Sequence, residues 1–178
     1  PQFEGLPLIP FERLKEQYAP DDVEILLGVG YTQMNNVRRR IFEACKQNGY
    51  ALAQYIHSSV RLSDAKMGEG NIIFEDTLLE PFVQIGSGNI IWYKSVIAHN
   101  STIGNFNLIA GNASICGFSQ VKNHCFIGSG AVIRDKIKIE DYTLVGAAAY
   151  AAADTQKFQV VAANKGVVLP NKSSLDYI

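Results

Sequence analysis

Residues 85–103 read IGSGNIIWYKSVIAHNSTI, with an isoleucine at every sixth position. The same column runs on in both directions without a break and comprises Met67, Ile73, Leu79, Ile85, Ile91, Ile97, Ile103, Ile109, Ile115, Val121, Ile127, Ile133, Ile139 and Val145. An α-helix repeats every 3.6 residues and a strand every 2.0, so neither holds this phase over such a length. A parallel β-helix, with one inward aliphatic side chain on each short face, does.

A second column agrees with the first. The position four residues after each aliphatic is mostly small or short: Thr77, Val83, Ser95, Ser101, Ala113, Ser119, Cys125, Ala131, Thr143 and Ala149. Larger side chains would not fit inside narrow coils. Since each buried aliphatic contributes roughly 1.5–3 kcal/mol, the coils need neither a metal nor a disulfide to form. The pattern predicts a β-helix domain over residues 59–153.

The two ends of the chain have other patterns. A short helix over 11–18 precedes an apolar run at 23–27 that predicts a buried strand, and an amphipathic spacing over 36–48 predicts a helix, followed by a strand over 50–56. Residues 1–58 therefore form a partial Rossmann-like βαβ unit. After Val145 the register decays, and we expect residues 154–178 to form a cap and tail that protect the open sheet edge.

Composition excludes several classes of protein. The 178 residues carry 16 basic and 17 acidic side chains, with no basic stripe of the kind that binds nucleic acid. No apolar run approaches the roughly 18 residues of a membrane span, and no signal peptide is visible in the sequence, which opens at Pro1 without an initiator methionine. Three cysteines without CxxC spacing argue against a disulfide framework or zinc site and for the cytoplasm.

The turn Gly28-Val29-Gly30 after the first strand has two readings. Glycines there let backbone amides approach a phosphate, but the third glycine of the dinucleotide fingerprint is replaced by Gln33, so the turn could equally be a plain connection. In the following run of three arginines the side chains splay around the helix by about 200°. Only Arg38, nearest the turn, is a candidate for a phosphate contact; the alternative is solvated surface.

Two histidines of the coils, His99 and His124, could act as a base near neutral pH. Both fall at outward or corner positions of their hexapeptides, where plain surface is the alternative reading. His57, at the junction between the two domains, reads better as a residue that holds the junction turn.

The segments 97–106 and 125–133, with Gly117 between them, resemble the sialic-acid O-acetyltransferase and bacillosamine-pathway N-acetyltransferase family of hexapeptide-repeat acyltransferases. The resemblance extends upstream through 28–31, 34–38, 49–50 and 56–59, so it covers nearly the whole chain. It implies a left-handed β-helix, an exception to the usual crossover handedness. It also implies a bacterial homotrimer with acetyl-CoA between subunits and a nucleotide-linked sugar as acceptor, in polysaccharide or glycan biosynthesis.

The resemblance also assigns roles by position. His99 would be the general base, and the Gly117 amide would stabilise the oxyanion of the tetrahedral intermediate. Phe118 and Gly128, with Gly117, would contact the coenzyme. The residues that would bind the acceptor are Gly28, Tyr31, Asn35 and Arg38. No metal is implied.

Two departures from the family pattern affect these roles. Asn100 stands where family members have an acidic residue beside the histidine, and an amide orients an imidazole without adding charge. Glu75 or Glu80 could substitute for the missing acid in space. The start of the chain resembles the segment after the family's first strand, helix and glycine-rich turn, so the βαβ unit is expected to be truncated.

Three alternatives remain open. Trp92 and Tyr93, on an outer face, indicate either subunit packing or a surface on which a base or sugar stacks. A γ-class carbonic anhydrase shares the β-helix, but its three-histidine zinc site cannot be built from His99, His124 and His57 at these spacings. A noncatalytic trimeric scaffold or binding module would account for Asn100 and the short amino-terminal unit.

Overall fold

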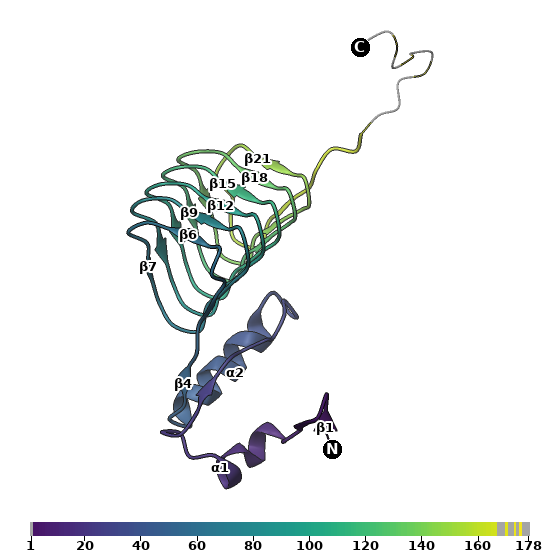
Figure 1. Ribbon diagram of the computed structural model, residues 1–178. Coiled ribbons are helices and arrows are strands. Elements are labelled where there is room, and N and C mark those ends of the chain that lie inside the picture. The colour runs from purple at the N-terminus through teal and green to yellow at the C-terminus, as the bar shows by residue number, and fades with distance from the viewer. Residues whose placement is uncertain (1, 167–169, 171–172, 174, 176–178) are drawn as a thin grey trace.

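The computed structural model describes residues 2–166, 170, 173 and 175, and its main body is a left-handed parallel β-helix. The strands form three parallel sheets, which we name after their first strands (Figure 1). The β5 sheet contains β5 (Tyr55–Ile56), β8 (Ile72–Ile73), β11 (Ile90–Ile91), β14 (Leu108–Ile109), β17 (Phe126–Ile127), β20 (Leu144–Val145) and β22 (Val160–Val161). The β6 sheet contains β6 (Arg61–Leu62), β9 (Leu78–Leu79), β12 (Val96–Ile97), β15 (Ser114–Ile115), β18 (Val132–Ile133) and β21 (Tyr150–Ala151). The β7 sheet contains β7 (Lys66–Met67), β10 (Gln84–Ile85), β13 (Thr102–Ile103), β16 (Gln120–Val121) and β19 (Lys138–Ile139).

The predicted aliphatic column is the core of these coils. Strand pairing joins residues 18 apart, as in Ile85 with Ile103 and Ile91 with Ile109. From Ile73 to Val145, each member of the column is at most 4% exposed, while Met67, in the first coil, is partly buried against it. The small-residue column is buried as well, and three asparagines that it includes, Asn71, Asn89 and Asn107, form an internal hydrogen-bonded ladder.

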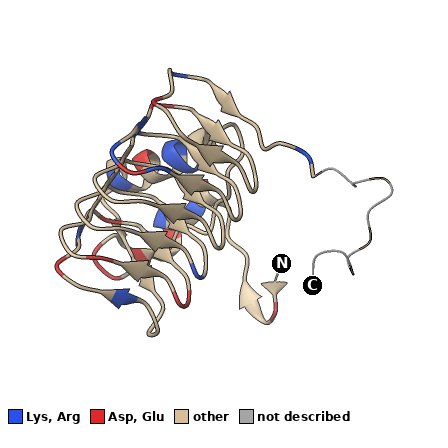
Figure 2. Ribbon diagram, turned by 90° about the horizontal axis from the view of Figure 1, so that it is seen from above, with Lys and Arg blue, Asp and Glu red and all other residues tan. Residues whose placement is uncertain are grey.

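Three corners separate the sheets, and each is turned by a residue with positive φ at six-residue intervals, such as Asn100, Phe118 and His124. The β6–β7 corner includes residues 81–82, 99–100, 117–118 and 135–136. The β7–β5 corner includes 69–70, 87–88, 105–106, 123–124 and 141–142. The β5–β6 corner includes 75–76, 93–94, 111–112, 129–130 and 147–148. Figure 2 shows positive and negative residues interspersed along the turns, with no continuous stripe of one sign in that view.

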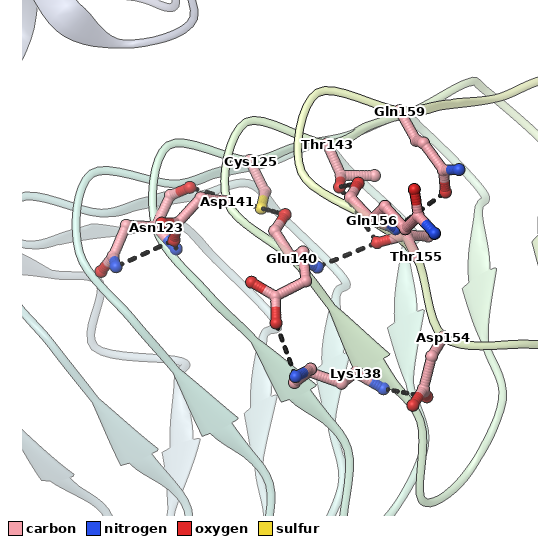
Figure 3. A network of polar contacts seen from close by, with 10 residues as sticks. All are labelled: Asn123, Cys125, Lys138, Glu140, Asp141, Thr143, Asp154, Thr155, Gln156 and Gln159. Carbon is pink, nitrogen blue, oxygen red and sulfur yellow. Dashed lines mark hydrogen bonds and ion pairs between the residues drawn. The ribbon is translucent and has the colours of Figure 1, made fainter.

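The last strand of the β7 sheet is capped by side chains (Figure 3). The amides of Lys138 and Glu140 donate to Asp154 Oδ1 at 2.8 Å and Thr155 Oγ1 at 2.9 Å. These oxygens replace the carbonyls of a further strand, which β19 lacks. Beyond them β22 pairs with β20, so residues 160–161 continue the β5 sheet. Residues 167–169, 171, 172, 174 and 176–178 of the expected tail lie outside the described part of the chain.

The amino-terminal segment contains the predicted βαβ unit in a shorter form. β1 (Gln2–Phe3) and β2 (Leu6–Pro7) form a hairpin, and the helix expected over 11–18 is a 3₁₀ turn, η1 (Phe11–Arg13), followed by α1 (Leu14–Gln17). β3 (Glu24–Ile25) and β4 (Ala51–Leu52) pair in parallel around α2 (Asn36–Gln47). The prediction of a single strand over 50–56 was wrong. The second half of this segment is β5, which pairs with β8 in the β-helix.

Arg38 fastens α2 to the β7–β5 corner. Its side chain is 1% exposed, and its guanidinium donates five hydrogen bonds: to the carbonyls of Val29, Gly30, Gly88 and Asn107, and to Asn35 Oδ1. Asn35 in turn donates to the Cys125 carbonyl at 3.1 Å. Four carbonyls from two parts of the chain therefore converge on one cation.

A stack of aromatic rings lies beside this cluster. His124 lies between Phe106, with ring centroids 5.5 Å apart, and Tyr142, at 4.7 Å and nearly parallel. Phe42 of α2 meets the edge of Phe106, and the Tyr142 hydroxyl donates to Asn36 Oδ1. Burial, and then the charge of Arg39, lowers the pKa of His124 below its ordinary value. The ring is therefore held neutral against α2.

Replacing Arg38 with methionine tests this fastening. The Arg38→Met variant should lose on the order of 3 kcal/mol of unfolding free energy, because charge-assisted hydrogen bonds are lost and buried carbonyls are left without donors. Chemical denaturation measures this loss. Arg40→Met, at an exposed position of the same helix, is the control and should change stability by less than about 0.5 kcal/mol. Equal effects in the two variants would contradict the role given to Arg38.

The buried His124 predicts a pH dependence. The unfolded chain takes up a proton on this residue near pH 6.5, whereas the folded chain does so only at lower pH. Stability is therefore full above pH 6.5 and falls as the pH drops below it. His124→Phe keeps the stack, since Phe106 has the same corner conformation one coil earlier, and should lose less stability between pH 7.5 and 5.5 than the wild type. Identical losses in denaturation at the two pH values would refute this assignment.

Candidate active site

His99 projects from the β6–β7 corner and is exposed. Its Nδ1 lies 3.1 Å from Asn100 Oδ1, which only accepts hydrogen bonds, so in this arrangement Nδ1 carries the proton. Nε2 then has a free lone pair and is available as a base. Asn100 therefore orients the imidazole, as an acid would, without contributing charge.

Gly117 lies one coil beyond His99, and its Cα is against the imidazole. A Cβ built on Gly117 would be 2.9 Å from Cε1 and 3.0 Å from Nε2 of His99, so only glycine leaves the ring in place. The Gly117 carbonyl accepts from the Lys136 amide at 3.0 Å. Nothing in the described part of the chain accepts a hydrogen bond from the Gly117 amide, which leaves this donor beside the base.

Phe118 and Glu80 complete the surroundings of His99. The Phe118 ring is 51% exposed and meets the His99 ring edge-on at 5.1 Å. Glu80 Oε2 accepts from the backbone amide of His99 at 2.9 Å. Of the two acids considered as substitutes for the family's acidic partner, Glu80 thus fixes the corner backbone; no hydrogen bond joins it to the ring among the described residues.

The glycine turn lies elsewhere, over the outer face of the β5 sheet. Gly28, Gly30 and Tyr31 border a cavity of about 450 Å³. The sheet side of this cavity consists of Ile72, Phe74, Ile90, Trp92, Tyr93, Leu108, Ala110, Gly111, Phe126 and Ser129. Trp92 and Tyr93 therefore face the same space as the turn. From the sequence, either subunit packing or ligand stacking had been possible for these two residues.

The expected phosphate contact of Arg38 is not met. All five N–H groups of its guanidinium are used by acceptors of the chain itself, and the side chain is buried, so no donor remains for a ligand. Asn35, also expected on the acceptor side, is fully buried and bonded to Arg38 and Cys125. Both residues shape the turn that borders the cavity instead of lining it.

The remaining expected residues are spread over other corners. Gly128 is buried at the β5–β6 corner, where a Cβ would collide with the backbone of Ala147, so it permits close stacking of coils. His57 Nδ1 is 2.9 Å from Ser59 Oγ at the domain junction, as expected for a turn-holding residue. One chain therefore brings His99, Asn100, Gly117 and Phe118 together, and separately Gly28 and Tyr31, but it does not unite the two groups.

Sequence reasoning missed the partners that lie one coil apart. Phe74 stacks on Trp92 at 4.8 Å, and Phe106, His124 and Tyr142 stack in turn. Both sets are spaced by 18 residues, so the repeat itself could have revealed them.

No protein-family model and no curated protein sequence matches the chain. Solved structures do: the acetyltransferase domain of PglB from Neisseria gonorrhoeae FA1090, in complex with acetyl coenzyme A, superposes with a TM-score of 0.81 at 23% identity, covering 89% of this chain and 77% of that one. This chain has the fold of hexapeptide-repeat acetyltransferases.

Two further solved structures share this fold. WeeI from Acinetobacter baumannii AYE has a TM-score of 0.75 at 22% identity, over 90% of this chain and 75% of that one. PerB from Caulobacter crescentus, in complex with CoA and GDP-perosamine, has a TM-score of 0.66 at 23% identity, over 72% of this chain and 60% of that one. Within the described residues, no group of three or more His, Cys, Asp or Glu side chains is arranged to hold a metal ion. None of the described helices is both long and apolar enough to cross a bilayer.

Adding a methyl group at Gly117 tests the arrangement around His99. In Gly117→Ala the new Cβ should push the exposed imidazole aside while the fold survives, because the obstacle is a movable side chain. The protein has three histidines, so NMR can follow each imidazole. We expect the His99 signals to move and those of His57 and His124 to stay. Gly166→Ala, where a Cβ meets nothing within 4 Å, is the control; unchanged His99 signals in Gly117→Ala would contradict the geometry.

Proposed function

We propose that this chain is an acetyl-CoA-dependent acetyltransferase that acts on an amino group or hydroxyl of a nucleotide-linked sugar. The observation that carries the proposal is the pairing of a free imidazole Nε2 on His99 with a free backbone amide on Gly117. These two groups accelerate acyl transfer: a base takes the proton of the attacking atom, and a donor stabilises the oxyanion. The PglB domain is solved with acetyl-CoA, and PerB with CoA and GDP-perosamine, which supports the same pair of substrates here.

His99 would work first as a base and then as an acid. Nε2 takes the proton from the acceptor amine or hydroxyl as that atom bonds to the thioester carbonyl carbon. Asn100 Oδ1 holds the Nδ1 proton throughout, which fixes the ring and its tautomer. When the carbon–sulfur bond breaks, Nε2 returns the proton to the sulfur, so the protein ends unchanged.

Gly117 would stabilise the charge that develops between these two proton transfers. Its amide can donate to the carbonyl oxygen as that oxygen becomes an oxyanion. Removing one such donor typically costs about 10²–10³ in turnover. Because the donor is main chain, its position depends on the corner conformation and not on a side-chain rotamer.

The surface next to Gly117 suits the rest of the coenzyme. A hollow of about 370 Å³ continues from Phe118 along the outer β7 sheet, past Gln120, Lys136 and Lys138 to Asp154. Phe118 offers an apolar ring near the proposed thioester position. Lys136 offers a cation for a phosphate, whereas Lys138 is already paired with Glu140. Phe118 thus stays in the proposed coenzyme site with Gly117, while Gly128 would reach the coenzyme only through another subunit.

The acceptor side of the proposal rests on the cavity beside Gly28 and Tyr31. His99 lies at a different corner of the same chain and does not line this cavity. The catalytic His99 and an acceptor bound in the cavity would therefore meet only if they belong to two different copies of the chain. This requirement favours an oligomer with sites between subunits, and the family resemblance implies that it is a homotrimer. Residues 1–58 would then carry the acceptor, 59–153 the acyl transfer and 154–178 the cap. We place the enzyme in a bacterial cytoplasm, in polysaccharide or glycan biosynthesis.

Acetyl-CoA binding and thiol release test this function. Acetyl-CoA at a hundredfold excess over its Kd should stabilise the protein by about 2.7 kcal/mol and raise its Tm by about 5–10 °C. Thiol release should appear with some member of a panel of UDP-, dTDP- and GDP-linked amino sugars. His99→Ala should lower turnover by about 10²–10⁴ and keep the Tm shift.

His57→Ala is the matched control and should retain turnover, because this histidine bonds to its own turn. Turnover that survives in His99→Ala would contradict the mechanism. Absence of both the Tm shift and thiol release would favour a noncatalytic trimeric scaffold.

A further inference from the structure

The chain between the glycine turn and α2 has an unfavourable backbone conformation. Gln33, Met34 and Asn35 follow one another with φ of 54°, 49° and 65°, in the left-handed region that is unfavourable for residues with a Cβ. Such a run persists only where the surrounding structure fixes it. Contacts with the β7–β5 corner do so, and we call residues 31–37, which include this turn, the latch segment.

Three contacts join the latch segment to the corner. Asn35 donates from Nδ2 to a backbone carbonyl of the corner at 3.1 Å. Asn36 Oδ1 accepts from the Tyr142 hydroxyl at 3.1 Å, and the backbone of Met34 hydrogen-bonds the ring of His124. Two of these contacts depend on the stack of rings, because Tyr142 and His124 lie nearly parallel with centroids 4.7 Å apart.

His124 is poorly placed to carry a positive charge. Its side chain is 7% exposed, and Nδ1 has no hydrogen-bond partner among the described residues. One other buried side-chain atom of the described chain shares this lack of a partner, and it is Arg39 Nε. Burial, and then the charges of Arg39 and Arg38, lower the pKa of the ring. The backbone of Met34 and the carboxylate of Asp141 oppose this effect and are outweighed.

The other charged groups at this contact do not offset a proton on His124. Asp141 Oδ1 already accepts two hydrogen bonds from the turn one coil earlier. Glu43 pairs with Arg39 at 3.0 Å. Lys157 adds a further cation, 5.4 Å from the centroid of the ring that stacks on His124. A protonated ring would therefore stand among cations, beside carboxylates that already have partners.

The rest of α2 is attached without His124. Arg38 donates to the carbonyls of Gly88 and Asn107, at 2.8 and 3.0 Å. Further along the helix, Lys46 pairs with Glu69 of the first coil at 2.9 Å. α2 is thus anchored from Arg38 onward, whereas the latch segment ahead of it depends on the His124 stack.

We propose that the latch segment opens in acid: protonation of His124 releases it from the corner, while the coils and α2 from Arg38 onward stay in place. In the open form water solvates the charged ring, and the left-handed turn relaxes. Tyr31, which meets Phe126 edge-on and borders the cavity, leaves with the segment. This opening goes beyond the proposed function and needs no substrate; only its effect on the acceptor rests on that function.

A single proton sets the direction and the size of the effect. A solvated histidine takes up its proton near pH 6.5, whereas His124 in the closed form does so only at lower pH. The open form therefore gains on the closed form as the pH falls below 6.5. Between pH 7.5 and 5.5 the ratio of open to closed should rise by at most about tenfold, the limit for one titrating group.

Hydrogen exchange of the full chain measures this opening. The amides of Asn35, Asn36 and Arg39 are hydrogen-bonded within this region in the closed form. We compare the wild type with His124→Phe at each pH, because the intrinsic exchange rate then cancels. From pH 7.5 to 5.5 the wild-type rate in the peptide covering 31–39, relative to the variant, should rise severalfold, up to about tenfold. Peptides over 42–48 and 103–110 should show no such rise.

Two further variants separate protonation from the loss of a contact. Tyr142→Phe keeps the ring but removes the hydroxyl that bonds to Asn36, so exchange over 31–39 should be faster by the same factor at every pH. His57→Phe removes a histidine at the domain junction and should match the wild type. An NMR titration of His124 in the wild type needs no variant: its midpoint should lie below pH 6.5, over the range in which exchange rises.

The same pH dependence of exchange in wild type and His124→Phe would overturn the proposal. A simultaneous loss of protection in the coils would also overturn it, because acid would then unfold the whole chain. The proposed function fails separately: absence of thiol release for every acceptor leaves the exchange result standing. With thiol release, the wild-type acceptor KM relative to His124→Phe should rise in acid together with exchange, and the acetyl-CoA-induced Tm shift should persist. A KM that does not follow exchange would reject the effect on the acceptor.

Discussion

The 18-residue coil is the constraint on which the rest of the molecule depends. The inward aliphatic side chain on each face fixes the register, and the register places every residue directly over the one 18 positions away. His99 and Gly117 meet for this reason, as do Phe74 with Trp92 and His124 with its two neighbours. A one-residue slip would turn the aliphatic column outward and separate all of these pairs at once.

The second determinant is the attachment of the βαβ unit by Arg38. This side chain joins the glycine turn to two neighbouring coils. The position of the turn over the outer face of the β5 sheet therefore depends on one buried cation. Burial lowers the pKa of Arg38 to about 10, which still leaves it charged at neutral pH. A positive charge in such a place is tolerable only because carbonyl dipoles surround it completely. Because the N–H groups of Arg38 donate to backbone carbonyls and to Asn35 Oδ1, none of them is free to bind a phosphate.

The six-residue repeat predicted the coils, because a strict repeat fixes which residues are neighbours. The left-handed winding and the roles proposed for His99 and Gly117 came from the family resemblance. The role of Arg38 could not be predicted in this way. Its partners Gly88 and Asn107 are 50 and 69 residues away, in a different domain, and no periodicity connects a helix to the corner on which it packs. The same holds for the cavity, which joins Gly28 to Trp92. The length of the second strand of the βαβ unit was overestimated, because the apolar run at 50–56 contributes first to the sheet with β3 and then to the β5 sheet.

Hydrogen exchange at the β6–β7 corner tests the central claim most directly, namely that the thioester of acetyl-CoA lies between His99 and the Gly117 amide. Gly117 is buried, but its amide has no acceptor within the described chain, so it should exchange faster than the hydrogen-bonded amides of Cys116 and Phe118 beside it. Addition of acetyl-CoA should slow exchange in the peptide that covers 115–121, and Gly117→Ala should lessen the effect. Unchanged exchange in this peptide, with acetyl-CoA bound and protecting other segments, would contradict the account.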